Sequence, residues 1–189
     1  MKLESDKILL RPYEVEYATS LYAWYYCGRY DDYFRHSGEA YRVADFQRYV
    51  DNPNVKIFCT FEKETGDLVG TCGMYEVKPF DKSCKLMLMI DDRFQKKGYM
   101  IDTLKILADF CIMTHQFHKI GFDILENNER LNRIVQEFGF QKESTIIDSS
   151  WQNGRYLNEN VYYMLEDRYK EIYYGIPSHS SSGNPGSSR

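Results

Sequence analysis

The sequence lacks the features that mark several specialised classes of protein. It has no run of about 18 apolar residues, and its first residues form no apolar stretch typical of a signal peptide. We therefore expect neither a membrane span nor a secretory signal. The five cysteines are widely spaced and include no CxxC pair, a usage typical of a reducing compartment. These absences predict a cytoplasmic protein.

Neither sign of charge dominates. The formal net charge is −4, so bulk electrostatics gives no support to nucleic-acid binding. Arg93, Lys96 and Lys97 form a local basic patch, but basic and aromatic residues do not interleave around it. His115 and His118 have a helical i, i+3 spacing with no third ligand at a defined distance, so we predict no metal site.

The chain has enough apolar residues for one packed domain. Of its 189 residues 43% are hydrophobic and 16% are aromatic. Residue periodicity and turn residues predict strands over 7–12, 55–62, 68–77, 83–90, 118–125, 141–148 and 156–165, and helices over 14–26, 43–50, 100–114, 129–137 and 166–174. This order predicts a mixed α/β layer with a largely antiparallel sheet, in which the strands of residues 55–90 form a meander. We expect a domain over 1–175 and a Ser/Gly-rich tail over 176–189.

A basic turn between a predicted strand and a predicted helix is the first candidate site. It runs from Arg93 to Tyr99 and contains one glycine, Gly98. Unpaired backbone N–H groups at a helix N-terminus bind phosphate, and Lys96 and Lys97 add positive charge. Taken alone, these residues favour a solvated turn over a phosphate site.

Several short motifs agree in order and spacing over roughly residues 7–170. They are ILLRP (8–12), DLVG (67–70), QKKGYM (95–100), HKI (118–120) followed by Asn128, EFGF (137–140) and GRY (154–156). Together they resemble the GNAT acetyltransferase superfamily, and within it the Rim-type branch that acetylates protein N-termini and related small-molecule amines.

The resemblance implies a GNAT-like fold and acetyl-CoA as co-substrate. In this fold the central strand splays from its neighbour, and pantetheine adds between them by strand-like hydrogen bonds. The resemblance assigns the pyrophosphate to the amides of residues 96–100 and the cofactor arm to Asn128. The full set of cofactor-binding candidates is Ile90, Gln95, Lys96, Lys97, Gly98, Tyr99, Met100 and Asn128.

The acceptor amine must lose a proton before it attacks the thioester, so a general base is expected. Where the family commonly has an acid, on the strand before the basic turn, this chain has Cys84 and Lys85. The nearest carboxylates in sequence are Glu76 and Asp81, and we predict Glu76 as the base. A solvated strand end is the alternative role of Glu76.

Three positions depart from the family pattern, which indicates a partly eroded acetyl-CoA site. Met100 replaces the Gly or Ala that ends the pyrophosphate loop, and Leu131 replaces a small residue. Val135 stands where the family usually has a tyrosine that acts as the acid.

Two hypotheses of function follow. The first is an N-acetyltransferase that moves acetyl from acetyl-CoA to a primary amine, either a protein N-terminus or a small molecule. The second is a catalytically inactive GNAT-fold protein that serves as a structural or assembly subunit of a large complex, such as a viral particle. In that case its protein partners would bind the C-terminal tail and the Tyr-rich segments, of which 22–26, 30–34 and 169–174 are the clearest.

Overall fold

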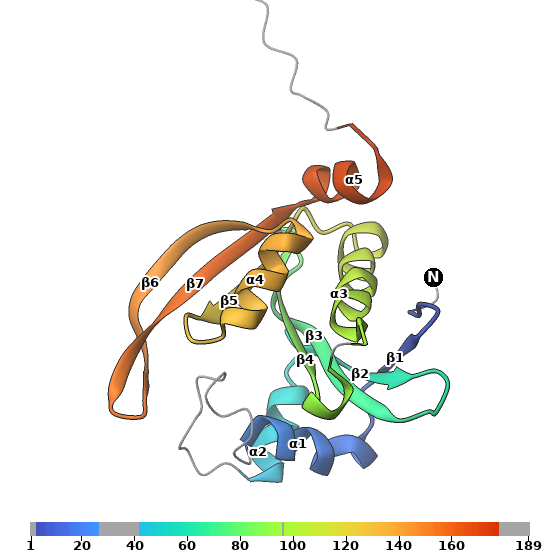
Figure 1. The fold of residues 1–189 in the computed structure, drawn as a ribbon, viewed down its shortest axis with the longest axis vertical. Coiled ribbons are helices and arrows are strands. Elements are labelled where there is room, and N and C mark those ends of the chain that lie inside the picture. The colour runs from blue at the N-terminus through green and yellow to red at the C-terminus, as the bar shows by residue number, and fades with distance from the viewer. Residues whose placement is uncertain (1–2, 27–41, 96, 178–189) are drawn as a thin grey trace, which may run out of the picture.

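The fold is seen in a computed structural model that describes residues 3–26, 42–95 and 97–177 (Figure 1). Its strands are β1 (Ile8–Pro12), β2 (Lys56–Glu62), β3 (Leu68–Lys78), β4 (Ser83–Ile90), β5 (Lys119–Leu125), β6 (Gln141–Gln152) and β7 (Arg155–Leu165). Its α-helices are α1 (Ala18–Tyr26), α2 (Val43–Val50), α3 (Tyr99–Asp109), α4 (Glu129–Phe138) and α5 (Glu166–Tyr174). Two 3-10 turns, η1 (Val15–Tyr17) and η3 (Asp92–Phe94), and a π-helical segment, η4 (Phe110–Thr114), complete the described elements.

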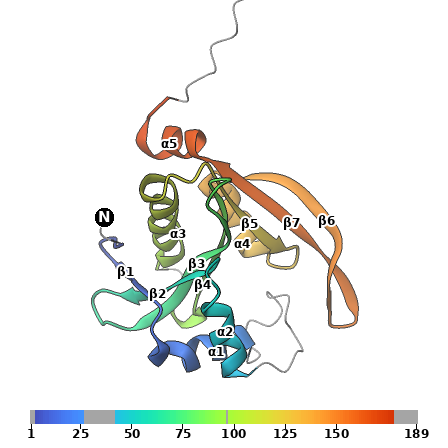
Figure 2. The same cartoon turned by 180° about the vertical axis from the view of Figure 1, so that it is seen from behind.

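One sheet of seven strands, in the order β1-β2-β3-β4-β5-β7-β6, forms the centre of the molecule. β4 and β5 are parallel, and the other neighbouring pairs are antiparallel. The predicted meander of β2, β3 and β4 and the predicted mixed, largely antiparallel sheet are both confirmed. The two views agree that the β6–β7 hairpin extends away from the rest of the sheet (Figures 1 and 2).

The predicted element boundaries differ from the observed ones by more than one residue in three places. The helix expected over 14–26 starts as the 3-10 turn η1, and the helix expected over 100–114 ends with the π-helical turn η4. The strand expected to end at Asp148 continues to Gln152 across irregular pairing with β7. Polar residues in a solvent-facing hairpin give little periodicity, which explains the short prediction.

The caps of α4 were readable from the sequence. The side-chain oxygen of Asn128 accepts a hydrogen bond from the amide of Leu131 at 3.1 Å, which satisfies one N–H of the first turn. Gly139 ends the helix with φ 112°, a left-handed conformation that favours glycine. These two residues fix the start and the end of α4 beside the sheet.

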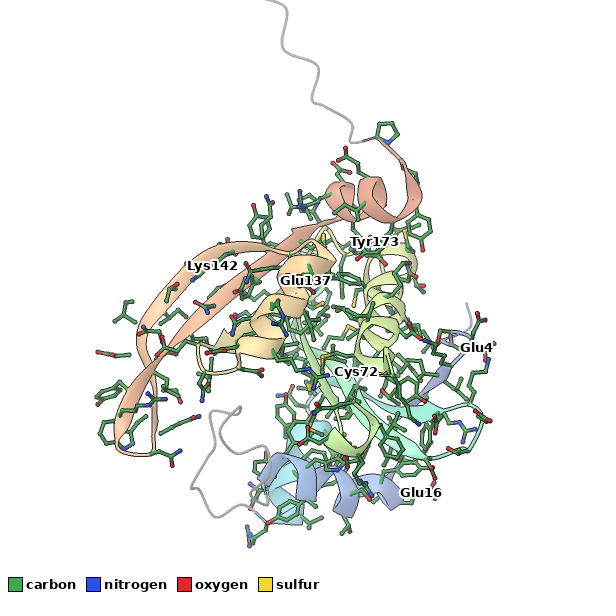
Figure 3. All side chains as sticks on the ribbon, viewed as in Figure 1. Glu4, Glu16, Cys72, Glu137, Lys142 and Tyr173 are labelled. Atoms are coloured by element: carbon green, nitrogen blue, oxygen red, sulfur yellow. The ribbon has the colours of Figure 1, made fainter. Side chains whose placement is uncertain are left out.

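The sheet buries a different set of side chains on each face. One core cluster lies under α3, α4 and α5 and includes Leu86, Leu107, Phe122 and Val135. The second lies under α1 and α2, where Leu21 and other buried side chains pack with partly buried ones such as Met87. Cys72, labelled in Figure 3, lies at the middle of the molecule and is fully buried. The two faces of β4 therefore meet different helices.

The Tyr-rich segments that were considered as partner surfaces contribute in part to the fold. In segment 169–174, Tyr169 is fully buried, and the hydroxyl of Tyr173 donates to the carbonyl of Phe138 at 2.8 Å (Figure 3). In segment 22–26, the tyrosines are partly buried against the α1–α2 core. Segment 30–34 and tail residues 178–189 lie outside the described residues. Among the described helices, none is long and apolar enough to cross a membrane.

Candidate functional site

The sheet opens between β4 and β5. These two strands pair only over three residues on each side, Ser83–Lys85 with Lys119–Gly121. Beyond this point β4 continues to Ile90 along β3, and β5 continues to Leu125 along β7. The facing edges of β4 and β5 therefore carry backbone groups that an extended ligand can pair with, as an added strand does. The splayed central strand implied by the family resemblance is present.

A turn rich in backbone donors lies at the wide end of this opening. We call residues 91–95, 97 and 98 the α3 turn; Lys96, predicted to bind the cofactor, lies outside the described residues. Gly98 has φ 83° and precedes the first residue of α3. The first amides of α3 have no acceptor within the helix, and the helix dipole makes this end positive. A diphosphate fits this chemistry.

The predicted cofactor residues differ in whether their side chains are available to contact a ligand. Ile90 is buried in the core, and Tyr99 is buried with its hydroxyl on the carboxylate of Glu62, so both are limited to backbone contacts with a ligand. Gln95 is half-buried directly after η3. Asn128 already uses its side-chain oxygen to cap α4. Its role on the cofactor arm stays a prediction.

The charge of the α3 turn is partly neutralised from β2. The ammonium of Lys97 lies 3.1 Å from Oε1 of Glu62, whose other oxygen accepts from Thr65 at 2.9 Å. The hydrogen bond from Tyr99, followed by those from Lys97 and Thr65, lowers the pKa of Glu62. Conversely, the hydrogen bond to Glu62 raises the pKa of Lys97. The side chain of Lys97 thus anchors the turn to β2.

The three residues that depart from the family pattern pack in the core. Met100 and Leu131 are partly buried against the cluster under α3 and α4, and Val135 is fully buried there. Their side chains therefore contribute to folding. Val135 offers no acid for the leaving thiolate, as the sequence indicated.

Glu76, the predicted base, lies on an irregular end of β3. Its backbone has φ 47°, and the pairing register of β3 with β4 shifts between Tyr75 and Lys78. Its side chain is 52% exposed, and its carboxylate lies 3.3 Å from the ammonium of Lys85. Glu76 is solvated and ion-paired, next to the point where β4 and β5 separate. The other carboxylate considered, Asp81, is exposed in the turn between β3 and β4.

A second carboxylate, that of Asp123 on β5, contacts the same ammonium group of Lys85. Its side chain is 6% exposed, and its Oδ2 lies 2.5 Å from the ammonium of Lys85 and 3.5 Å from the hydroxyl of Tyr75. Its Oδ1 is buried and has no hydrogen-bond partner among the described residues. A buried carboxylate oxygen without a donor is costly, which makes it a candidate to accept a proton from a ligand.

Lys85 links the two carboxylates. Burial lowers the pKa of Lys85, but Asp123 and then Glu76 outweigh that effect and raise it. Lys85 therefore stays protonated between two acids. Asp123 was missed from the sequence, although one signal was present: it is the acid within the otherwise apolar stretch GFDIL (121–125). Among the described residues, no group of three or more His, Cys, Asp or Glu is arranged to hold a metal ion.

This sheet, opened between β4 and β5 with a donor-rich turn at its wide end, is the GNAT fold. Residues 7–141 match the family described as "Acetyltransferase (GNAT) domain", and the chain belongs to that family.

Two curated relatives are N-acetyltransferases by name. One is the uncharacterized N-acetyltransferase YoaA of Bacillus subtilis, 24% identical over 56% of this chain and 60% of the relative. The other is the spermidine N(1)-acetyltransferase of Vibrio cholerae, 23% identical over 54% of this chain and 60% of the relative. The chain thus spans 60% of the length of each.

A crystal structure of spermidine N-acetyltransferase from Vibrio cholerae in complex with CoA and spermine superposes with a TM-score of 0.79. The match covers 87% of this chain and 99% of that one at 18% identity, and it confirms the fold. The similarity gives no support to the alternative of a structural or assembly subunit.

Proposed function

We propose that the protein transfers the acetyl group of acetyl-CoA to a primary amine. The observation that carries this proposal is the opening between β4 and β5, with Asp123 near its narrow end and the α3 turn at its wide end. Pantetheine would pair with the strand edges, and the diphosphate would lie on the amides around Gly98. Gln95, Asn128 and the other predicted cofactor residues stay part of this proposal.

In the reaction, the nitrogen lone pair of the amine attacks the thioester carbonyl. The C–N bond forms, the C–S bond breaks, and the products are an acetamide and the free thiol of CoA. The amine arrives mostly as an ammonium ion, so one proton must leave before attack. We propose that Oδ1 of Asp123 accepts it, directly or through one water, because Lys85 occupies only Oδ2. As the amide forms, the attacking nitrogen loses its second proton to solvent, and the departing thiolate takes up a proton from solvent.

Glu76, the base predicted from the sequence, is the competing proposal. Both carboxylates flank Lys85, and both would favour a cationic acceptor. One of the two curated relatives is a spermidine N(1)-acetyltransferase, and the motif resemblance suggests a Rim-type enzyme that acts on peptide N-termini. We therefore propose a primary amine as the acceptor class, with polyamines and peptide N-termini as the first candidates.

Binding is tested by isothermal titration of the protein with acetyl-CoA, using Gly98→Trp as the blocked control. We expect micromolar binding that the substitution abolishes. No binding at millimolar acetyl-CoA would refute the proposed function.

The base is tested by measuring CoA release with a panel of amines for Asp123→Asn and Glu76→Gln. If Asp123 is the base, its variant loses about 10²- to 10⁴-fold in kcat, and its remaining rate rises with pH as the free amine accumulates. Glu76→Gln then loses much less. The reverse result would assign the role to Glu76.

A further inference from the structure

Trp24 joins α1 to the first residue of the α3 turn by a hydrogen bond. Its indole Nε1 donates to Oδ2 of Asp91 at 3.0 Å. Asp91 is the first residue after β4 and is 3% exposed. It is therefore a buried carboxylate that receives a donor from a helix on the other side of the sheet from α3.

The same carboxylate organises the start of the α3 turn. Its Oδ1 accepts from the backbone amide of Arg93 at 2.9 Å, and the guanidinium of Arg93 lies 2.9 to 3.2 Å from its oxygens. Its backbone amide donates to the carbonyl of Val69, and its carbonyl accepts from Phe94, both at 2.9 Å. Burial raises the pKa of Asp91, but the bonds from Arg93 and Trp24 outweigh burial and lower it. The group stays ionised and holds the turn.

The far end of the α3 turn has its own anchor. There the buried carboxylate of Glu62 binds the ammonium of Lys97 and the hydroxyl of Tyr99. Glu62 belongs to β2, and its carboxylate accepts hydrogen bonds from Thr65 of the β2–β3 loop, Lys97 of the α3 turn and Tyr99 of α3. The turn is thus held by one carboxylate at each end, and the one at Asp91 also binds α1.

α1 lies over the face of β4 where the proposed chemistry takes place. The hydroxyl of Tyr25, the residue after Trp24, lies 3.6 Å from the sulfur of Met87. Met87 is two residues after Lys85 and on the same face of β4, since strand side chains alternate. An acceptor that approaches Asp123 from this face therefore passes beside α1. The hydrogen bond between Trp24 and Asp91 therefore links the position of α1 to the position of the α3 turn.

We propose that Asp91 is a positioning residue that couples cofactor binding at the α3 turn to the placement of α1 over the acceptor face, with Trp24 as the contact between them. The proposal rests on the proposed function, because it requires a ligand on the turn and an acceptor beside α1. A ligand that orders the α3 turn also orders the carboxylate of Asp91. The indole of Trp24, which is bonded to that carboxylate, then moves with it. Linkage then requires an acceptor that contacts α1 to strengthen cofactor binding by the same factor.

The chain supplies its own probe for this coupling. It has two tryptophans, and the second, Trp151, is 59% exposed on the β6–β7 hairpin next to Tyr156. Trp151→Phe leaves Trp24 as the sole tryptophan, whose emission reports on the indole N–H bond. We expect CoA to change this emission with the dissociation constant that calorimetry gives. Asp91→Asn in the same background should abolish the change while CoA still binds.

Glu62→Gln is the matched control, because it releases the other end of the turn without touching α1. It should raise the KM for acetyl-CoA and keep the Trp24 response. Asp91→Asn and Trp24→Phe should each raise the KM of the acceptor about 5- to 10-fold with a smaller change in kcat. The double variant should raise the KM of the acceptor no more than Asp91→Asn alone, since Trp24→Phe removes only a contact that Asp91→Asn already weakens.

The outcomes separate the two proposals. If calorimetry shows no CoA binding, the proposed function and this inference both fail. If CoA binds but the emission of Trp24 does not change, the coupling is overturned and the acetyltransferase proposal stands. The same conclusion follows if Asp91→Asn and Glu62→Gln alter the two KM values in the same way.

Discussion

Gly70 of β3 lies beside the last residues of β4, at the wide end of the opening between β4 and β5. It pairs with Ile90, and a Cβ at Gly70 would lie 2.3 Å from the carbonyl oxygen of Met89 and 2.7 Å from Cδ1 of Ile90. Since Cβ atoms do not come within 3.0 Å of other atoms, Gly70→Ala requires the backbone of β4 to move by at least 3.0 − 2.3 = 0.7 Å. The end of β4 has no partner on its β5 side, so it moves toward the opening.

Overpacking of this kind costs about 1–3 kcal/mol of unfolding free energy. For a chain of this length each kcal/mol lowers Tm by about 2–4 °C, so we expect Gly70→Ala to lower Tm by several degrees. The shift of β4 also narrows the proposed cofactor site, so the affinity for acetyl-CoA should fall in parallel. Unfolding in urea and calorimetric titration measure the two effects.

Gly121→Ala in β5 is the control. Its Cβ would lie 2.8 Å from the carbonyl oxygen of Tyr162, so a backbone shift of 3.0 − 2.8 = 0.2 Å removes the steric clash. The lower backbone entropy of the unfolded alanine chain offsets a strain this small, and we expect a near-neutral stability. Equal stability of the two variants would refute the close approach at Gly70. A loss of stability at Gly70→Ala without a loss of acetyl-CoA affinity would refute the link to the opening.

Three further substitutions test other parts of the structure. Asn132→Ala should lower the free energy of unfolding, measured in urea, by about 2–4 kcal/mol. The buried side-chain amide of Asn132 donates to the carbonyls of Leu125 and Asn128 and accepts from Asn160 and Tyr162. As the control, Gln136→Ala on the exposed side of α4 should lower it by less than half as much. Glu62→Gln should reduce the dependence of the free energy of unfolding on pH at acidic pH. The lowered pKa of Glu62 means that its contribution is present above the unfolded value of about 4.3 and is lost as pH falls through the folded value. An unchanged profile between pH 3 and 6 would contradict this role. Lys105→Met should speed amide hydrogen exchange in α5 about fivefold. The ammonium of Lys105 lies 4.7 to 5.4 Å from the ring centres of Tyr169, Tyr173 and Tyr174, and these cation–π contacts stabilise α5 by about 1 kcal/mol. Unchanged exchange would show that Lys105 does not hold α5 through these rings.

Local signals in the sequence determined most of the elements. The cap at Asn128, the left-handed stop at Gly139 and the glycine before α3 act within one or two turns of chain, so their residues predicted the elements correctly. The motif order also predicted the family, because the pyrophosphate turn and the strand–Asn–helix unit are each continuous in sequence.

Tertiary structure alone decided which side chains meet. Glu76, Lys85 and Asp123 come from three strands, and the parallel pairing of β4 with β5 brings the last two to 2.5 Å. The same holds for Trp24 and Asp91, which are 67 residues apart in sequence. The sequence predicts Lys97 as a cofactor residue, and the tertiary structure adds that its ammonium pairs with a carboxylate on β2. Ion pairs and buried hydrogen bonds depend on the register of distant strands, and no local pattern of residues encodes that register.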